Sequence, residues 1–466
     1  MRALNRSFLT PFLAAATTRG VLLGGVACGL AWAVVTLPPP AAAALTLGGF
    51  GATLWILQPE IAVLALTGIC PLLLAFDFGE MRELRVHDLL LGLLALSTIT
   101  SLRSAQQRWQ RFSGFPAGVL LGLWAFLLLW GTVTYLLGPA NQWLLKDPLR
   151  NSWYLYRDVW RVLLPFPLLA FCLKSRLEAR RVIDLLLAVS TLAAAYAVVQ
   201  AMRTGEHASE PFLTKNSLAD YVVLAIPFVL SRLLLGHGGT ERILHAGALL
   251  ILLRALWLSG SRGGLVAFVA SLLPFALFVP RRRVMAAAAG VLIFLSIVAV
   301  WRVDLLDRPM VRRFATLASP TEEENLQWRE EQWGIFLERV AKRPWLGTGS
   351  EMDVGLAEKG RAMTAHNVYL GLAVRSGLPN LAAWLALLGL IGLWAGREAS
   401  REKAATDRTL WVGLGGCLVA LVVSNLVETS LLMPQVQQFL WTVLAISLLE
   451  RSVRGAEPHP REVVLA

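Results

Sequence analysis

Long apolar runs alternate with short polar segments along almost the whole chain. Each run holds roughly 16–22 residues, the length that crosses the hydrocarbon core of a bilayer as a helix. About fourteen runs qualify, or twelve if one early pair is re-entrant or interfacial. The pattern predicts an all-α polytopic integral membrane protein with about 12–14 transmembrane helices. The candidate spans cover residues 19–37, 41–57, 61–76, 88–102, 115–138, 158–173, 182–202, 217–235, 243–258, 263–279, 284–301, 379–395, 409–427 and 436–450.

Composition agrees with this pattern and removes several classes of protein. The 466 residues are 56% hydrophobic and only 16% charged, whereas a soluble domain carries about a quarter charged residues. A chain this apolar cannot cover its surface with polar groups in water. This excludes an ordinary cytoplasmic enzyme, a disordered protein and a nucleic-acid-binding module. The four cysteines lie inside apolar runs without a CxxC pair, so neither a disulfide nor a zinc site is expected.

The net charge of +12, from 43 Lys and Arg against 31 Asp and Glu, is best explained by topology. Basic clusters occupy short loops that alternate along the predicted spans, and cytoplasmic loops collect Lys and Arg. We therefore expect these loops and both termini in the cytoplasm, together with the whole basic excess. The net charge thus gives no evidence for an acidic partner. The clusters lie within residues 103–111, 174–181, 281–283 and 397–408.

One long segment, about residues 302–378, is expected on the external side. Within it, residues 322–342 predict an amphipathic helix that lies on the bundle or at the membrane surface, and Pro344 helps to end it. Its apolar face consists of Trp333, Phe336, Leu337 and Val340. The predicted organisation is N-terminal transmembrane helices at 1–210, central ones at 211–301, this external loop, C-terminal ones at 379–450, and a cytoplasmic tail at 451–466.

Arg262 is the first residue with candidate chemistry. It lies between Ser261 and Gly263, where one predicted span ends and the next begins. Arginine, a glycine-rich turn and the free N–H groups of a helix start together favour phosphate binding. The alternative is an interfacial arginine that holds lipid headgroups.

His366 is the only histidine of the long external segment, and it precedes an apolar stretch that returns to the membrane. A histidine can take a proton from a hydroxyl near neutral pH. Asn367 could orient the imidazole ring or a substrate. The alternative is a histidine with a purely structural role.

Arg329 lies four residues before Trp333 on the predicted amphipathic helix. It is a second candidate cation for an acidic ligand. The alternative is a residue on a solvated face, or one that forms an ion pair with its neighbour Glu330 or Glu331.

Further polar residues lie at the external ends of predicted spans. Lys215 and Asn216 begin one span, and Arg161 lies at the edge of another. Each is a candidate for holding a headgroup or anchoring its span. Glu351 and Asp353 form an acidic pair that could bind a divalent metal, although such pairs are common in exposed loops.

Four motifs in this order resemble the O-antigen ligase and polymerase superfamily of bacterial envelope biogenesis. They are SRGG at 261–264, R-x3-W at 329–333, RPWLGTGS at 343–350, and HNVYL at 366–370 followed by SGLP at 376–379. The resemblance covers roughly residues 210–395. The order of the motifs, around a large loop in the C-terminal third, is fairly specific for the superfamily.

The resemblance implies a GT-C-like, membrane-embedded glycosyltransferase of the bacterial inner membrane that needs neither a metal nor a cofactor. Its donor would be a glycan on undecaprenyl pyrophosphate, its acceptor a sugar hydroxyl of lipid A–core, and its active site would face the periplasm. By motif position, Arg262 and Arg329 would bind the pyrophosphate, and His366 would activate the hydroxyl. A one-step displacement would invert the anomeric carbon.

Three other functions stay open from the sequence. An O-antigen polymerase shares the superfamily, and we favour the ligase because one histidine with two arginines resembles that branch most closely. A lipid-linked oligosaccharide transporter would not need such an asymmetric external site. A structural membrane protein would leave Arg262, Arg329 and His366 unexplained.

Overall fold

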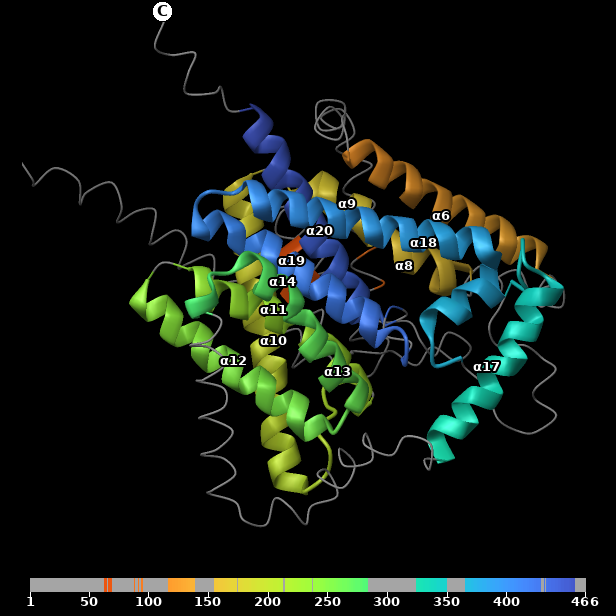
Figure 1. Ribbon diagram of the computed structural model, residues 1–466, viewed down its shortest axis with the longest axis horizontal. Helices are drawn as coiled ribbons and strands as arrows, with labels where there is room; N and C mark the ends of the chain where they lie inside the picture. Colours follow the sequence, from red (N-terminus) through yellow and green to blue (C-terminus); the bar gives the residue numbers. More distant parts are fainter. Residues whose placement is uncertain are drawn as a thin grey trace, which may run out of the picture.

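The computed structural model describes most of the chain between residues 116 and 456. Within the described residues the chain forms helices and no strand, which confirms the all-α prediction (Figure 1). The described residues are 116–138, 155–173, 175–212, 214–236, 238–283, 324–349, 365–428, 431 and 433–456, together with a few positions between 63 and 94.

Six helices in this part of the chain are long and apolar enough to cross a membrane, so the multi-pass prediction is confirmed. They are α6 (Ala117–Leu137), α10 (Arg176–Thr204), α11 (Lys215–Leu235), α12 (Gly239–Ser259), α18 (Val368–Arg401) and α19 (Ala405–Ser424). The spans predicted at 19–37, 41–57 and 284–301 lie outside the described residues, and the total of 12–14 spans stays a prediction.

Shorter or more polar helices complete the bundle. The predicted span 263–279 is divided at Leu272 into two helices, and the predicted span 158–173 begins with a π-helical turn. These elements are η5 (Tyr156–Trp160), α8 (Arg161–Leu163), α9 (Pro165–Cys172), α13 (Arg262–Ser271), α14 (Leu273–Phe278), α17 (Glu324–Lys342) and α20 (Pro434–Ala456).

In the described part of the chain, four helix starts are fixed by a capping side chain that accepts a hydrogen bond from the backbone N–H three residues later. Such caps satisfy N–H groups that have no partner inside the helix. Two of these caps belong to the motifs SRGG and HNVYL. The capping residues are Ser175, Thr214, Ser261 and Asn367.

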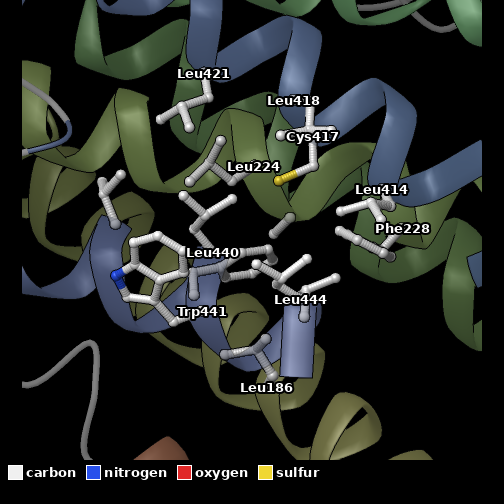
Figure 2. Packing of buried hydrophobic residues seen from close by; sticks show 14 of the residues in the cluster. Leu186, Leu224, Phe228, Leu414, Cys417, Leu418, Leu421, Leu440, Trp441 and Leu444 are labelled. Atoms are coloured by element: carbon white, nitrogen blue, oxygen red, sulfur yellow. The ribbon is translucent and has the colours of Figure 1, made fainter. Parts of the chain in front are cut away.

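The core lies between α10, α11, α19 and α20, whose leucine and aromatic side chains interdigitate (Figure 2). Glycines of α19 bring its backbone close to α11. A Cβ atom on Gly413 would lie 2.5 Å from the ring of Phe228, and one on Gly416 would lie 2.7 Å from Pro227. Small residues therefore allow close helix packing, which drives helix association inside a bilayer, where the hydrophobic effect between helices is absent.

The bundle has two ends, because hydrogen bonds join the helix termini in two separate groups. At one end, Arg283 Nη1 donates to Leu234 O at 2.8 Å, and Arg408 Nη1 donates to Phe278 O at 3.3 Å. We call this the basic end. It carries the described members of the basic clusters after residues 174, 280 and 396. At the other end, the start of α18 is bonded to the end of α19.

The predicted amphipathic helix is confirmed as α17, which packs on the first part of α18 at the edge of the bundle (Figure 1). Phe336 is fully buried against Ala365 and Val374, and Val340 is partly buried beside them. Leu337, also on the predicted apolar face, has 59% of its residue surface exposed. The buried stripe is therefore narrower than the sequence pattern indicated.

The RPWLGTGS segment crosses α18 where that helix is kinked at Gly377, which has a φ of 78°. A Cβ atom on Gly377 would lie 2.0 Å from the Trp345 carbonyl oxygen, and one on Gly347 would lie 2.4 Å from that of Val374. Only glycine tolerates this approach together with positive φ. Because α18 already begins at Val368, the end of the predicted 302–378 loop is helical.

Candidate active site

Glu428 is the centre of the polar group at the end of the bundle opposite the basic end. This residue follows the end of α19, and its side chain is only 11% exposed. Its Oε1 accepts hydrogen bonds from Asn216 Nδ2 at 2.8 Å and from Arg329 Nη2 at 3.2 Å, and its Oε2 lies 3.9 Å from His366 Nδ1. One carboxylate thus gathers three residues that the sequence had predicted as site residues.

Arg329 is held by two acceptors near the start of α17. Besides its bond to Glu428, its Nη1 donates to the Val427 carbonyl oxygen at 2.7 Å. The alternative of pairing with Glu330 or Glu331 is therefore wrong, because the described ion pair of Arg329 is with Glu428. The guanidinium is 24% exposed and so can still reach a ligand.

His366 is positioned by the residues on either side of it. Ala365 is buried, and its carbonyl accepts a hydrogen bond from Trp333 Nε1 at 2.8 Å. On the other side, Asn367 Oδ1 caps α18 by accepting from the N–H of Leu370 at 3.0 Å. His366 itself has a φ of 44°, a strained conformation that is enriched at functional sites. Its side chain is 34% exposed.

Arg262 is the first residue of α13, and the rest of the SRGG motif explains how that helix start reaches Glu428. A Cβ atom on Gly263 would lie 2.8 Å from a methyl of Val427, the neighbour of Glu428. A Cβ atom on Gly264 would lie 2.9 Å from Ala219 on α11. The two glycines thus have packing roles, and Ser261 is the cap of the helix.

Two side-chain hydrogen bonds join α11 to the end of α19 and the residues that follow it. The first is donated by Asn216 to Glu428. The second lies one turn deeper in the bundle, where the buried hydroxyl of Ser424 donates to Asp220. Lys215, the half-buried first residue of α11, precedes Asn216 in the same turn. These two hydrogen bonds fix the position of the Glu428 carboxylate along α11.

Arg161 belongs to a second cluster, which lies deeper in the protein. It forms an ion pair with Asp88 at 3.6 Å, and Tyr156 donates a hydrogen bond to the same carboxylate at 3.0 Å. Residues five apart point in different directions in an α-helix, but the π-helical turn η5 brings Tyr156 and Arg161 to one side. Arg161 is only 5% exposed, and its predicted position at the external end of a span stays a prediction.

Sequence reasoning missed Glu428, although the sequence carries a signal for it. It is the only charged residue between Arg408 and Glu450. An ionisable side chain within or beside a membrane span is a functional candidate by default. Its partners were not deducible, because Asn216 and Arg329 lie 212 and 99 residues away along the chain.

The group suits an anionic ligand and a proton transfer. Arg329 supplies a cation beside the carboxylate, and the imidazole of His366 lies next to it. Lys215 and Arg262 are the sequence neighbours of Asn216 and Gly263, which contact Glu428 and Val427. Among the residues that the structure describes, no three His, Cys, Asp or Glu side chains are placed to hold a metal ion. The acidic pair at 351 and 353 lies outside those residues.

Part of the chain matches a known protein family. Residues 247–385 match the family model described as O-antigen ligase. The match covers less than half of the chain and confirms the resemblance predicted from the motifs. It contains Arg262, Arg329 and His366, but neither Asn216 nor Glu428. No curated protein matches the chain.

Proposed function

We propose that this chain is an O-antigen ligase. It transfers a glycan from undecaprenyl pyrophosphate to a sugar hydroxyl of lipid A–core, at the periplasmic face of the bacterial inner membrane. The observation that carries the proposal is the convergence of Arg329, His366 and Asn216 on Glu428, beside the helix start that bears Arg262.

In this proposal Arg262 and Arg329 bind the pyrophosphate of the donor. Two guanidiniums and the N-terminus of α13 stabilise the negative charge that develops on the leaving diphosphate. The charge needs no metal ion to offset it. Lys215 and Asn216 border the same site. Arg161 is expected to affect substrate binding only indirectly, by stabilising the fold.

The acceptor step uses His366 as the general base. The acceptor oxygen attacks the anomeric carbon, and its proton passes to the Nε2 atom of His366. The bond from that carbon to the diphosphate oxygen breaks, and its electron pair leaves with the diphosphate. Attack from the opposite face inverts the anomeric configuration. Glu428 faces Nδ1 and so stabilises the imidazolium that forms.

Orientation follows from the positive-inside tendency. We place the basic end and both termini in the cytoplasm, which leaves the Glu428 end in the periplasm. Sugar acceptors and lipid-linked donors of the outer leaflet would then meet at one site. Accessibility of a cysteine introduced at Lys342, on the exposed face of α17, to a membrane-impermeant thiol reagent tests this orientation.

Reconstitution tests the proposed activity. Purified full-length protein is mixed with a lipid-linked donor and rough lipopolysaccharide, with and without a chelator. Transfer that survives chelation is the expected result, and loss of transfer on chelation would overturn the metal-independent mechanism. A deletion strain separates ligase from polymerase. Without the ligase, core carries no repeat at all, whereas without the polymerase it carries a single repeat.

A further inference from the structure

Trp345, in the segment that follows α17, presents its side chain to the outside of the protein. Its residue surface is 71% exposed, whereas tryptophan is highly buried on average. Leu346 and Leu378 beside it are exposed as well. Arg329 lies near the other end of α17, so the proposed transfer reaction does not use this group. Clustered exposed apolar side chains mark a surface that meets a protein or a membrane.

The backbone that carries Trp345 is held against the kink of α18. The N–H of Leu378 donates to the Pro344 carbonyl oxygen at 2.7 Å, and the N–H of Thr348 donates to that of Val374 at 2.8 Å. These bonds fix the chain on both sides of Trp345. Its exposure is therefore a property of a fixed segment, and the ring is presented outward by the fold.

Two further tryptophans mark the level of this segment along α6. Trp130 Nε1 donates to the Ser376 carbonyl oxygen at 3.0 Å, and Trp160 Nε1 donates to Thr132 Oγ1 at 3.0 Å. Both bonds are made toward the end of α6, which is long and apolar enough to cross a membrane. Tryptophan collects at the boundary between hydrocarbon and water, because its ring is apolar and its N–H needs a partner. This level is therefore the membrane boundary.

The apolar outer surface of α6 continues toward the segment of Trp345. Leu136 and Leu137, the last two residues of α6, are exposed. The next residue, Gly138, packs on the segment, since a Cβ atom on it would lie 2.4 Å from Cα of Gly349. The end of α17 thus lies beside the end of α6 (Figure 1). The segment is joined to the end of a span whose outer side chains face lipid.

Arg343 adds a cation to this surface. It is exposed and precedes Trp345 by two residues. A guanidinium binds phosphate groups, and a neighbouring indole ring fits the region just below them. Because phospholipid headgroups carry phosphate and this level is the membrane boundary, the combination favours a lipid surface over a protein partner.

We propose that Arg343, Trp345 and Leu346 form a membrane anchor on the phospholipid leaflet at the Glu428 end of the bundle. The indole ring and Leu346 enter the boundary region, and Arg343 contacts lipid phosphates. Since α17 is continuous, the anchor also holds one end of the helix that bears Arg329. That consequence rests on the proposed function, whereas the anchor itself does not.

Depth-dependent quenching tests the anchor in the full-length protein, reconstituted into vesicles of phosphatidylethanolamine and phosphatidylglycerol. A fluorescent dye on Leu346→Cys, with Trp345 intact, should be quenched more by a nitroxide at the lipid headgroup than by one deep in the acyl chain. Leu129→Cys, exposed on α6, should show the reverse order, and Glu331→Cys, exposed on α17, should show little quenching by either. Protein without an introduced cysteine gives the background. A dye at position 346 that behaves like one at 331 would overturn the proposal.

Side-chain variants test which groups make the anchor. In Trp345→Asp, headgroup quenching of the dye at position 346 should fall to the level seen at 331, because a carboxylate is costly at the edge of the hydrocarbon. Trp345→Tyr should keep it, since tyrosine shares the preference for the boundary. Arg343→Glu should also lower it, by repelling lipid phosphates. Both positions are exposed, so an unchanged midpoint of thermal unfolding is expected. Unchanged quenching in Trp345→Asp would overturn the anchor.

Transfer assays in the same vesicles separate the anchor from its link to the reaction. Trp345→Asp should lower transfer, whereas Trp345→Tyr should not. Lost quenching with unchanged transfer in Trp345→Asp would show that the anchor does not position Arg329. Absence of transfer by the unaltered protein would overturn the proposed function and leave the anchor, which quenching measures, in place.

Discussion

Two arginine–carboxylate pairs of this protein differ in their surroundings. Arg329 and Glu428 are 24% and 11% exposed, and Glu428 also bonds Asn216 and faces His366. Arg161 and Asp88 are 6% and 2% exposed, and Asp88 also accepts from Tyr156. The first pair lies where a ligand can reach it, whereas the second is enclosed by the protein.

The difference separates arginines that can bind a ligand from those that hold the fold. A buried ion pair contributes little net stability, but removing one partner leaves an uncompensated charge in a medium of low dielectric constant. A partly exposed pair can exchange its partner for water or a ligand at modest cost. Substitution of Arg329 should therefore reduce activity without reducing stability. Substitution of Arg161 should reduce activity only as far as it reduces stability.

His366→Ala should have the largest effect on transfer. Removal of a general base typically lowers the rate by about 10²–10⁴-fold, and donor should accumulate on its lipid carrier. Transfer of labelled glycan to rough lipopolysaccharide measures this. Tyr369→Phe, three residues further along α18, is the control and should keep near-normal transfer. Normal transfer by His366→Ala would show that another group is the base.

Arg329→Ala should come next, with a loss of about 10²–10³-fold in transfer, as for removal of one group that stabilises a developing charge. Arg329→Lys should recover only part of it, because the single nitrogen of lysine cannot reproduce the planar guanidinium, whose two nitrogens reach Val427 O and Glu428 separately. Lys342→Ala is the control on the same helix, where that side chain is 71% exposed. Equal losses in both variants would indicate damage to α17 as a whole.

The sequence predicted most described helices because bilayer thickness and capping chemistry act locally. Apolar runs of span length and residues such as Ser261 and Asn367 need no tertiary information. It also identified Arg262, Arg329 and His366 from motifs. The division of α13 from α14 and the π-helical turn at Tyr156 depend on packing with other helices, which a local pattern does not contain.

Partners within the site were the part that the sequence could not supply. Arg329 has acidic neighbours at 330 and 331, so a local pair was the natural expectation, yet it bonds to a residue 99 positions away. The partner of Arg161 was likewise not predictable. Arg161 forms an ion pair with the buried Asp88, which also accepts a hydrogen bond from Tyr156, 68 positions away along the chain. Tertiary contacts decided both cases.

Arg161→Met should chiefly reduce stability. The variant leaves Asp88 buried without its cation, which typically costs about 3–5 kcal/mol, and thermal unfolding in detergent should show a lower midpoint. Transfer per folded molecule should stay within a few-fold of the unaltered protein. Asp88→Asn added to Arg161→Met should restore much of the stability, because the amide is neutral and can still accept from Tyr156. A stable but inactive double variant would instead support a direct role of Arg161 in substrate binding.

Asn216→Ala should have the smallest effect of this series. It removes one neutral donor from Glu428 while the hydrogen bond from Arg329 remains, so about 1 kcal/mol is expected, or a several-fold loss of transfer. Asn216→Asp changes few atoms but places a second carboxylate 2.8 Å from the first, which repels Glu428 and competes for Arg329. Its loss of transfer should therefore exceed that of the alanine variant. Equal losses in the two variants would mean that Asn216 acts only as a spacer between α11 and α19, and that the charge balance around Glu428 does not govern the reaction.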